Sequence, residues 1–439
     1  MFAILANRSY RHLFSAQIIA LIGTGLATVA LGLLAFELAG DNAGVVLGTA
    51  LAIKMIAYVG VAPIASAFAE RVPRRAMLVT LDVMRGLVAV LLPFVTEIWQ
   101  VYVLIFVLQS ASAGFTPTFQ ATIPHILPDE REYTRALSLS RLAYDLESVA
   151  SPLLAAALLM VISFNGLFAG TVVGFFASAL LVHSVRLPSP RPTAPRGFYD
   201  RTTRGIRIYL KTPRLRGLLA INLAAAAAGA MVIVNTVVLV QGRFGLGNSE
   251  TALALAAFGG GSMLAALALP TLLDRMPDRP IMLWAAAAAA GLMIAGSLVQ
   301  GFVALLVLWV FVGAAYSASH TPSGRLLRKS AHPEDRPAVF AAQFALSHAC
   351  WLLTYPLVGW LGAAAGLPLA FLAMGTIAIV GAALAWSLWP RNDAEIVAHS
   401  HMDLDPHHPH IVGAERTRRG YRHAHAYVID AEHAAWPVG

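Results

Sequence analysis

Charged residues and cysteine are both scarce in this sequence. Aspartate, glutamate, lysine and arginine make up 12% of the 439 residues, about half of their share in an ordinary soluble protein. Hydrophobic residues make up 58%, so the chain has too little polar surface to cover itself in water. The single cysteine, Cys350, excludes an internal disulfide, and its apolar surroundings favour a role as a small hydrophobic residue.

Catalytic motifs are missing as well. The sequence has no nucleotide-binding loop, no arrangement of a nucleophile with its base, and no metal-hydrolase motif. We therefore expect neither an enzyme nor a bound cofactor. The net charge of +8 could indicate a nucleic-acid partner, but the basic residues lie in short loops rather than on one face. We expect no nucleic-acid binding.

What the sequence does have is twelve long apolar runs, with its basic residues in alternate gaps between them. Of 31 lysines and arginines, 28 fall on one side of a membrane crossed by these runs, while Lys54 and Arg85 lie inside runs and Arg243 on the other side. Cytoplasmic loops carry the excess of lysine and arginine, so the pattern predicts an all-α polytopic membrane protein with both termini in the cytoplasm. The first run is longer than a signal-peptide core, which predicts an uncleaved helix. The runs are 13–37, 44–68, 76–95, 99–117, 141–163, 166–187, 216–240, 250–273, 281–299, 302–320, 338–361 and 367–389.

A proline-rich and then basic segment divides the runs into two sets of six. It predicts a cytoplasmic linker, 188–215, between an N-terminal half, 1–187, and a C-terminal half, 216–389, with a polar tail over 390–439. An internal repeat supports the division. The sequence Glu70-Arg71-Val72-Pro73-Arg74-Arg75 recurs 204 positions later as Asp274-Arg275-Met276-Pro277-Asp278-Arg279, Thr116-Pro117 recurs as Thr321-Pro322, and Pro152 as Pro356.

The loop after the second run carries a family resemblance. Ser66-Ala67-Phe68-Ala69-Glu70-Arg71-Val72-Pro73-Arg74-Arg75 resembles the signature of the major facilitator superfamily: glycine, three residues, aspartate, a basic residue, any residue, glycine and two basic residues. The loop departs from it at Ser66, Glu70 and Pro73, so the tight-turn glycines are absent. The resemblance covers residues 8–389. It implies two parallel six-helix repeats that rock around a central site.

Acidic and basic residues near these loops are candidates for a gate. They could form charge-assisted bonds that break when the halves rock, or they could be topological anchors with solvated salt bridges. The candidate gating residues are Glu70, Arg71, Asp82, Arg85, Asp274 and Arg275.

Ionisable residues inside the apolar runs are candidates for substrate binding or proton coupling, because each costs about 2.5–3.5 kcal/mol to insert. Lys54 lies ten residues into the second run, and its alternative role is a buried pair with a carboxylate on a neighbouring helix. Asp145 and Glu147 could carry protons, or could pair with Arg141 as structural ions. His348 could bind a metal or a proton, or hydrogen-bond to a neighbouring helix.

The polar tail is rich in histidine. A His-x-His pair in an extended chain places both imidazoles on one side, and imidazole suits zinc, copper, nickel and cobalt. The alternative is a disordered or pH-sensitive segment. The candidate ligands are His399, His401, His407, His408, His410, His423, His425 and His433. The residues expected to dock the far end on another surface are Tyr421, Tyr427, Val428, Ile429 and Trp436.

These features predict a monomeric secondary active transporter in a bacterial inner (plasma) membrane. The tail is similar to that of nickel and cobalt resistance efflux carriers, which implies proton-coupled export of a divalent transition metal cation. The alternative is export of an organic small molecule, such as a drug or siderophore, with a regulatory tail. Lys54 favours that alternative because it would repel a bare dication. A third possibility is a non-transporting metal or pH sensor. The expected partners are the lipid bilayer, protons, and a metal-ion or small-molecule substrate.

Overall fold

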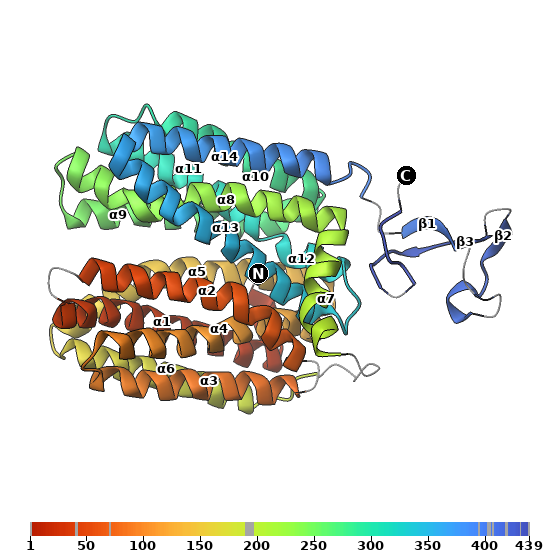
Figure 1. Cartoon of the computed structure of the whole chain (residues 1–439), viewed down its shortest axis with the longest axis horizontal. Helices are drawn as coiled ribbons and strands as arrows, with labels where there is room; N and C mark the ends of the chain where they lie inside the picture. Colours follow the sequence, from red (N-terminus) through yellow and green to blue (C-terminus); the bar gives the residue numbers. More distant parts are fainter. Residues whose placement is uncertain are drawn as a thin grey trace.

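The computed structural model describes residues 2–39, 43–69, 72–188, 197–393, 396–401, 405, 408–417, 420–430 and 432–437. Within these residues, twelve helices of 18 residues or more form two groups of six that lie side by side (Figure 1). The first group holds α1 (Arg8–Ala39), α2 (Ala43–Ala69), α3 (Arg74–Leu91), α4 (Ile98–Ile126), α5 (Glu130–Leu159) and α6 (Phe164–His183). The second holds α8 (Pro213–Val237), α9 (Asn248–Leu273), α10 (Asp278–Gly296), α11 (Phe302–His320), α13 (Arg336–Ala365) and α14 (Leu367–Leu388).

The prediction of an all-α membrane protein is confirmed for this body of the molecule. A helix satisfies its backbone hydrogen bonds internally, so it can cross a bilayer. Among the described residues, ten helices are long and apolar enough to do so. Helix α2 is not one of the ten, because its apolar stretch, Ala52–Ala65, is shorter. The twelfth, α5, carries several charges along its first half.

Two helices extend well beyond their apolar runs. The fourth run ends at Pro117, yet α4 continues through Pro117 and Pro124 to Ile126. The fifth run begins at Arg141, yet α5 begins at Glu130, where the Asp129 side chain accepts a hydrogen bond from the Glu132 backbone. These extensions reach the end of the molecule that holds α7 (Phe198–Lys211), α12 (Ser323–Lys329) and the tail, which we call the basic end (Figure 1).

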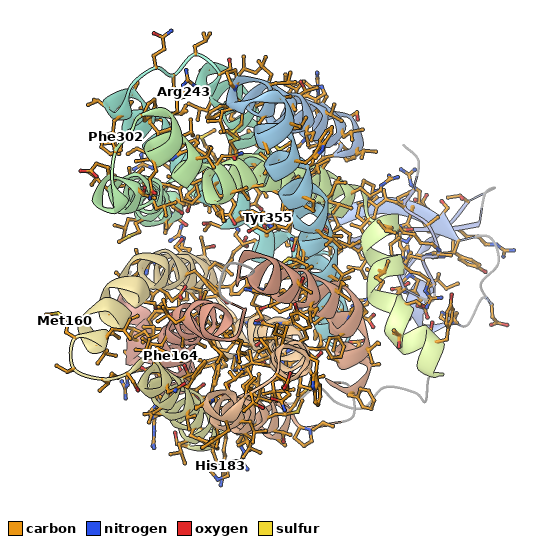
Figure 2. All side chains as sticks on the ribbon, turned by 60° about the vertical axis from the view of Figure 1, so that its left-hand side comes forward. Met160, Phe164, His183, Arg243, Phe302 and Tyr355 are labelled. Atoms are coloured by element: carbon orange, nitrogen blue, oxygen red, sulfur yellow. The ribbon has the colours of Figure 1, made fainter. Side chains whose placement is uncertain are left out.

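The opposite end carries the loops that the sequence assigned to the other side of the membrane. Met160 and Phe164, between α5 and α6, lie at that end together with Arg243 and Phe302 of the second group (Figure 2). Short helical turns lie at Phe2–Ala6, Leu92–Phe94, Val238–Arg243 and Pro409–Ile411.

The amphipathic helix α7 lies in the predicted linker and packs against α13 at the basic end. Arg204 on α7 makes two hydrogen bonds to the buried carboxylate of Asp335, at 2.6 and 2.7 Å. Such a two-pronged pair fixes the orientation of both partners. Residues 189–196 of the linker lie outside the described part of the chain, and the proposed domain boundaries stay a prediction.

The tail contains a small antiparallel sheet that the sequence did not predict. Its strands are β1 (Ile396–His401), β2 (Glu415–Thr417) and β3 (Gly420–Ala426), in the order β1-β3-β2. The register of β1 and β3 places His399 opposite His423. The sheet therefore brings together histidines that lie more than twenty positions apart in the sequence.

Close backbone approach holds the helices of one group together. A Cβ atom added to Gly313 on α11 would lie 1.9 Å from the backbone oxygen of Phe258 on α9. In lipid the hydrophobic effect gives helices little reason to associate, so contacts between small residues carry the packing. Gly291 on α10, by contrast, faces open space, with no atom within 4 Å of an added Cβ.

Gly313→Ala should therefore destabilise the protein by about 1–3 kcal/mol, because the helices must separate to admit the methyl group. Thermal unfolding in detergent is the measurement. Gly291→Ala is the matched control and should keep or slightly raise the melting temperature, because alanine favours helix. Equal melting temperatures for the two variants would contradict the close approach of α9 and α11.

Candidate functional site

A cavity of about 480 Å³ lies between the two helix groups. Helices α1 to α5 line one wall, and α11, α12 and α13 line the other. Both groups therefore line the cavity. This is the arrangement expected for a site whose access depends on the relative position of the two groups. The polar and aromatic side chains on its walls include Gln17, Thr24, Lys54, Tyr58, Arg85, Gln120, Tyr144, Glu147, Tyr316, His320, Gln343, Phe344, His348 and Trp351.

Tyr58 joins Lys54 to the facing wall. The Lys54 ammonium lies 5.6 Å from the centre of the Tyr58 ring, within the range of a cation–π contact. The Tyr58 hydroxyl donates a hydrogen bond of 2.8 Å to the Gln109 side-chain oxygen. The same ring meets His348 of the second group edge to face, with 4.7 Å between the ring centres. Lys54 thus lies at the seam between the groups.

Glu147 is the acidic partner of Lys54 in the cavity. The two side chains come from α5 and α2 and attract one another across the cavity. The backbone of α1 approaches this pair at Gly25, where an added Cβ would lie 2.5 Å from the Glu147 oxygen. The side chains of Asp145 and Arg141, the other candidates of this helix, lie outside the described residues.

His348 is held in one tautomer by its own helix. Its Nδ1 lies 2.7 Å from the Phe344 carbonyl oxygen, which can only accept, so Nδ1 carries the proton and Nε2 of the neutral ring is free to accept. The ring also stacks against Phe344, with 4.2 Å between centres. His348 is therefore part of an aromatic cluster on the cavity wall.

Asp82 and Arg85 form an ion pair inside the first group. Both lie on α3, Ser178 of α6 donates a 2.7 Å hydrogen bond to Asp82, and the Arg85 guanidinium lies over the rings of Phe115 and Phe175. All of these partners belong to α3, α4 and α6. The pair thus lies within one group, and its gating role stays a prediction.

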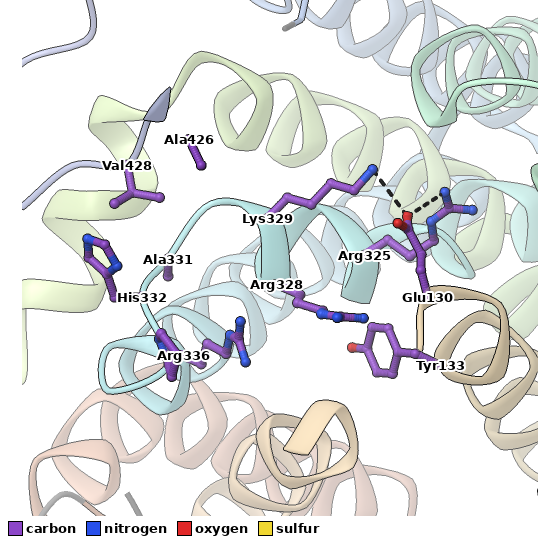
Figure 3. Close-up of a pocket in the computed structure, with 11 residues that line it drawn as sticks. Glu130, Tyr133, Arg325, Arg328, Lys329, Ala331, His332, Arg336, Ala426 and Val428 are labelled. Carbon is purple, nitrogen blue, oxygen red and sulfur yellow. Dashed lines mark hydrogen bonds and ion pairs between the residues drawn. The ribbon is translucent and has the colours of Figure 1, made fainter. Parts of the chain in front are cut away.

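Ion pairs at the basic end join the two groups. Glu130 at the start of α5 accepts a hydrogen bond of 2.7 Å from Arg325 and lies 3.2 Å from the Lys329 ammonium, both on α12 (Figure 3). Asp274 lies 4.0 Å from Arg131 across the same seam. Partly exposed pairs of this kind contribute about 0.2–1 kcal/mol each.

Of the residues that make these contacts between the groups, the sequence analysis named Asp274 and missed the others. Asp274 contacts the opposite group, and Arg275 beside it is exposed. Glu70 and Arg71 lie outside the described residues. The sequence analysis did not name Glu130, Arg325 or Lys329 as candidates. The sequence does not show which charges in these loops form ion pairs, because the pairing depends on the fold.

The tail holds a compact cluster of imidazoles. One ring nitrogen from each of five histidines lies within 4.8 Å of all the others. The cluster consists of His399, His410, His423, His425 and His433. His401 lies beside it, with its Nε2 atom 3.0 Å from that of His399. Burial and the neighbouring imidazoles lower the pKa of His401 and His423 to about 4, so both are neutral at pH 7.

Two further tail histidines were candidates for ligands. His408 lies apart from the cluster and accepts a hydrogen bond from the His410 backbone at 3.3 Å. His407 lies outside the described residues. The far end of the tail is docked on the body, because the Lys211 ammonium of α7 donates a 2.8 Å hydrogen bond to the carbonyl of Ala434.

Comparison with known proteins identifies the family. Residues 13–302 and 218–409 match the model of the Major Facilitator Superfamily. The chain belongs to the major facilitator superfamily. It is therefore a multi-pass membrane protein of a family of transporters.

Curated relatives match part of this superfamily chain. Macrolide efflux protein A of Streptococcus pyogenes is 24% identical over 181 residues, which cover 40% of the chain and 44% of the relative. The uncharacterized MFS-type transporter YfiS of Bacillus subtilis is 26% identical over 120 residues, which cover 27% of the chain and 28% of the relative. The chain thus spans less than half the length of these relatives.

Solved structures share the fold of this superfamily chain over most of its length. The human organic anion transporter MFSD10 (TETRAN) matches with a TM-score of 0.74 at 12% identity, over 86% of this chain and 99% of that one. The fucose:proton symporter FucP of E. coli matches with a TM-score of 0.70 at 14% identity, over 87% and 98%. At such identities the likeness establishes the fold alone.

Glu130→Gln should loosen the basic end, because it removes the charge that holds two cations of the other group. The ratio of closed to open molecules should fall by about twofold to tenfold. Spin labels at Glu132 and Met276, placed on either side of the seam in a Cys350→Ser background, report the distance across it. Glu97→Gln removes an exposed charge at the opposite end and should leave the distance distribution unchanged. An unchanged distribution in Glu130→Gln would remove this pair from the gate.

Proposed function

We propose that the protein exports an organic small molecule across the plasma membrane in exchange for protons. The observation that carries this proposal is the separation of two kinds of side chain. The cavity between the groups is walled by aromatic, amide and hydroxyl side chains, and its charged lining residues are Lys54, Arg85 and Glu147. In the described part of the chain, the group of histidine and acidic residues that could share a metal ion lies in the tail.

This separation favours the organic substrate over the metal cation that the tail implied. A dication crossing the membrane needs ligands in the central cavity, where Lys54 would repel it. A cavity of about 480 Å³ falls in the size range of sites for drug-sized organic ligands. The partial similarity to a macrolide efflux protein agrees with export of an organic compound.

Glu147 is the proposed proton carrier. A carboxylate in the cavity attracts a cationic or hydrogen-bond-donating group of the substrate strongly while it is ionised, and much more weakly once a proton has neutralised its charge. Competition for the same oxygen atoms couples substrate release to proton uptake. Lys54 lies where it can stabilise the carboxylate before the proton arrives. His348, on the facing wall, is the proposed contact through which the second group responds to the state of this pair.

The gate completes the proposed cycle. The positive-inside rule assigns the basic end, with both termini, to the cytoplasm. The pairs of Glu130 with Arg325 and Lys329 then close the cytoplasmic side in the state described by this structure. Their rupture would open the cavity to the cytoplasm, where an exporter collects its substrate.

Growth of a deletion strain and its complemented parent on a panel of toxic organic compounds and metal salts tests the substrate class. We expect complementation to raise resistance to at least one organic compound and to leave metal resistance unchanged. Resistance to nickel, cobalt or zinc alone would instead establish metal export.

Glu147→Gln should lower the rate of efflux driven by a proton gradient by tenfold or more, a loss of about 1.4 kcal/mol or more in coupling. Exchange of labelled for unlabelled substrate without a gradient should persist, because the cavity remains. Both rates are measured in proteoliposomes with the compound found in the growth assay. Glu132→Gln, an exposed charge at the start of the same helix, is the control and should behave like the wild type. Gradient-driven efflux at the normal rate in Glu147→Gln would assign the proton to another group.

Lys54→Met should insert into the membrane at least as well as the wild type, because it removes a buried charge. Transport should fall, since the Glu147 carboxylate loses its cationic neighbour. Protein amount in isolated membranes and initial efflux rate are measured together. Normal efflux by Lys54→Met at equal protein would make the lysine a structural ion only.

A further inference from the structure

Three histidines of the tail aim unprotonated nitrogens at one point. Nδ1 of His399 lies 3.0 Å from the Val397 carbonyl oxygen, Nδ1 of His425 lies 2.9 Å from that of Ala426, and Nδ1 of His433 lies 2.8 Å from an Asp430 carboxylate oxygen. These oxygens accept hydrogen bonds, so each Nδ1 carries the ring proton. Each neutral ring is left with a bare lone pair on Nε2.

By this assignment no proton lies between the bare nitrogens of His399 and His433, and further imidazole nitrogens lie close to both. Nε2 of His399 is 3.0 Å from Nε2 of His433 and 3.1 Å from that of His423. Nε2 of His410 lies 3.2 Å from that of His433. The Nε2 atom of His425 is buried and has no hydrogen-bond partner among the described residues. Facing lone pairs repel one another unless a cation lies between them.

We propose that His399, His410, His423, His425 and His433 bind one divalent late transition metal ion, and that this ion regulates the transporter. Imidazole nitrogens bind such ions at about 2.0–2.1 Å, so adjacent ligands around one ion lie about 2.9–3.4 Å apart. The shortest separations in the cluster, 3.0 to 3.2 Å, fall in that range. An all-imidazole site suits zinc, nickel, cobalt and copper(II) rather than magnesium or calcium.

The surroundings of the ligands have the form of a metal site. Ligating histidines nearly always donate the other ring N–H to a carboxylate or carbonyl, which fixes the tautomer and raises the basicity of the ligand. His433 does this through Asp430, whose carboxylate also accepts a 2.7 Å hydrogen bond from the His433 backbone. His433 itself is almost fully buried.

Asp430 also connects the cluster to the gate. Its other carboxylate oxygen lies 3.1 Å from Nε2 of His332. His332 lies in the short loop between α12 and α13, and α12 carries the Arg325 and Lys329 that hold Glu130 of the first group. A single carboxylate thus touches both a ligand of the proposed ion and the loop that positions the gate.

The tail also forms part of the wall around the gate. Ala426 and Val428 line a pocket of about 270 Å³ together with Glu130, Arg325 and Lys329 (Figure 3). Elsewhere the Arg214 guanidinium lies 5.1 Å from the centre of the Trp436 ring. The docked tail therefore accompanies a closed gate in this structure. An ion that stiffens the tail favours this docked form, so we expect the metal to hold the basic end closed and to slow transport.

Titration of the full-length protein in detergent with zinc chloride and with nickel chloride, followed by calorimetry, tests the site. The wild type should bind one ion per chain. His399→Ala/His423→Ala should weaken binding by roughly 100-fold or more, and His425→Ala, which removes a nitrogen with no other partner, should weaken it by roughly tenfold or more. His12→Ala/His183→Ala, which removes two histidines of the helical body, should bind like the wild type.

The link to the gate is tested without a transport assay, so that its failure is distinguishable from failure of the proposed function. In the protein spin-labelled at Glu132 and Met276, zinc should at least double the population with the short distance across the basic end. His332→Ala should still bind zinc with the affinity of the wild type but should lose this shift. A measurement of efflux in proteoliposomes rests on the proposed function. In it, zinc on the tail side should slow efflux by the wild type and should not slow efflux by His332→Ala.

Each contrary result overturns either the metal site or its link to the gate. Absence of saturable binding by the wild type, or equal affinity in the two double variants, overturns the metal site. Binding without a change in the distance distribution, or an equal change in His332→Ala, overturns the regulatory link and leaves a metal site that serves only the fold of the tail.

Discussion

The cost of charge in the hydrocarbon core is the constraint on which this structure depends. A lysine or arginine at the middle of a spanning helix costs about 2.5–3.5 kcal/mol, and nearly all such residues lie outside the apolar runs. The two exceptions each face an acid. Arg85 lines the cavity, but its partner Asp82 is fully buried. Lys54 and Glu147 both line the cavity, which is why we assign transport to that pair.

The contacts within each helix group differ in kind from the ion pairs that join the groups at the basic end. Within a group, backbones touch at glycines such as Gly313 and Gly381, where an added Cβ would meet the backbone of another helix. Such packing is lost entirely if the helices separate. Between the groups at the basic end, Glu130 is held by partly exposed cations, each worth about 1 kcal/mol or less. The ion pairs at this seam are therefore weaker than the backbone contacts within a group, which suits the proposed role of the basic end as a gate.

The tail follows a different rule because it lies outside the helical body. About 40 residues seldom bury enough apolar surface to fold alone. Here imidazoles from β1 and β3 cluster with His410 and His433, where a larger domain would have a core of aliphatic side chains. A bound metal ion would compensate for the missing core. It would also explain why a sheet so small is docked on α7 and on the loop after α12.

The sequence by itself determined the twelve-helix body, because an apolar run and the sign of its flanking charges are local properties. It also identified Lys54, Glu147 and the tail histidines, since a charge in an apolar run and a high density of histidine need no fold to be seen. Tertiary structure alone decided where α4 and α5 end, because helices can continue past the bilayer without an apolar signal. It alone paired Glu130 with Arg325, 195 positions away, and it alone determined which five of the seven described tail histidines lie together in one cluster. Both choices depend on distances across the fold, and a linear pattern of residue types does not contain such distances.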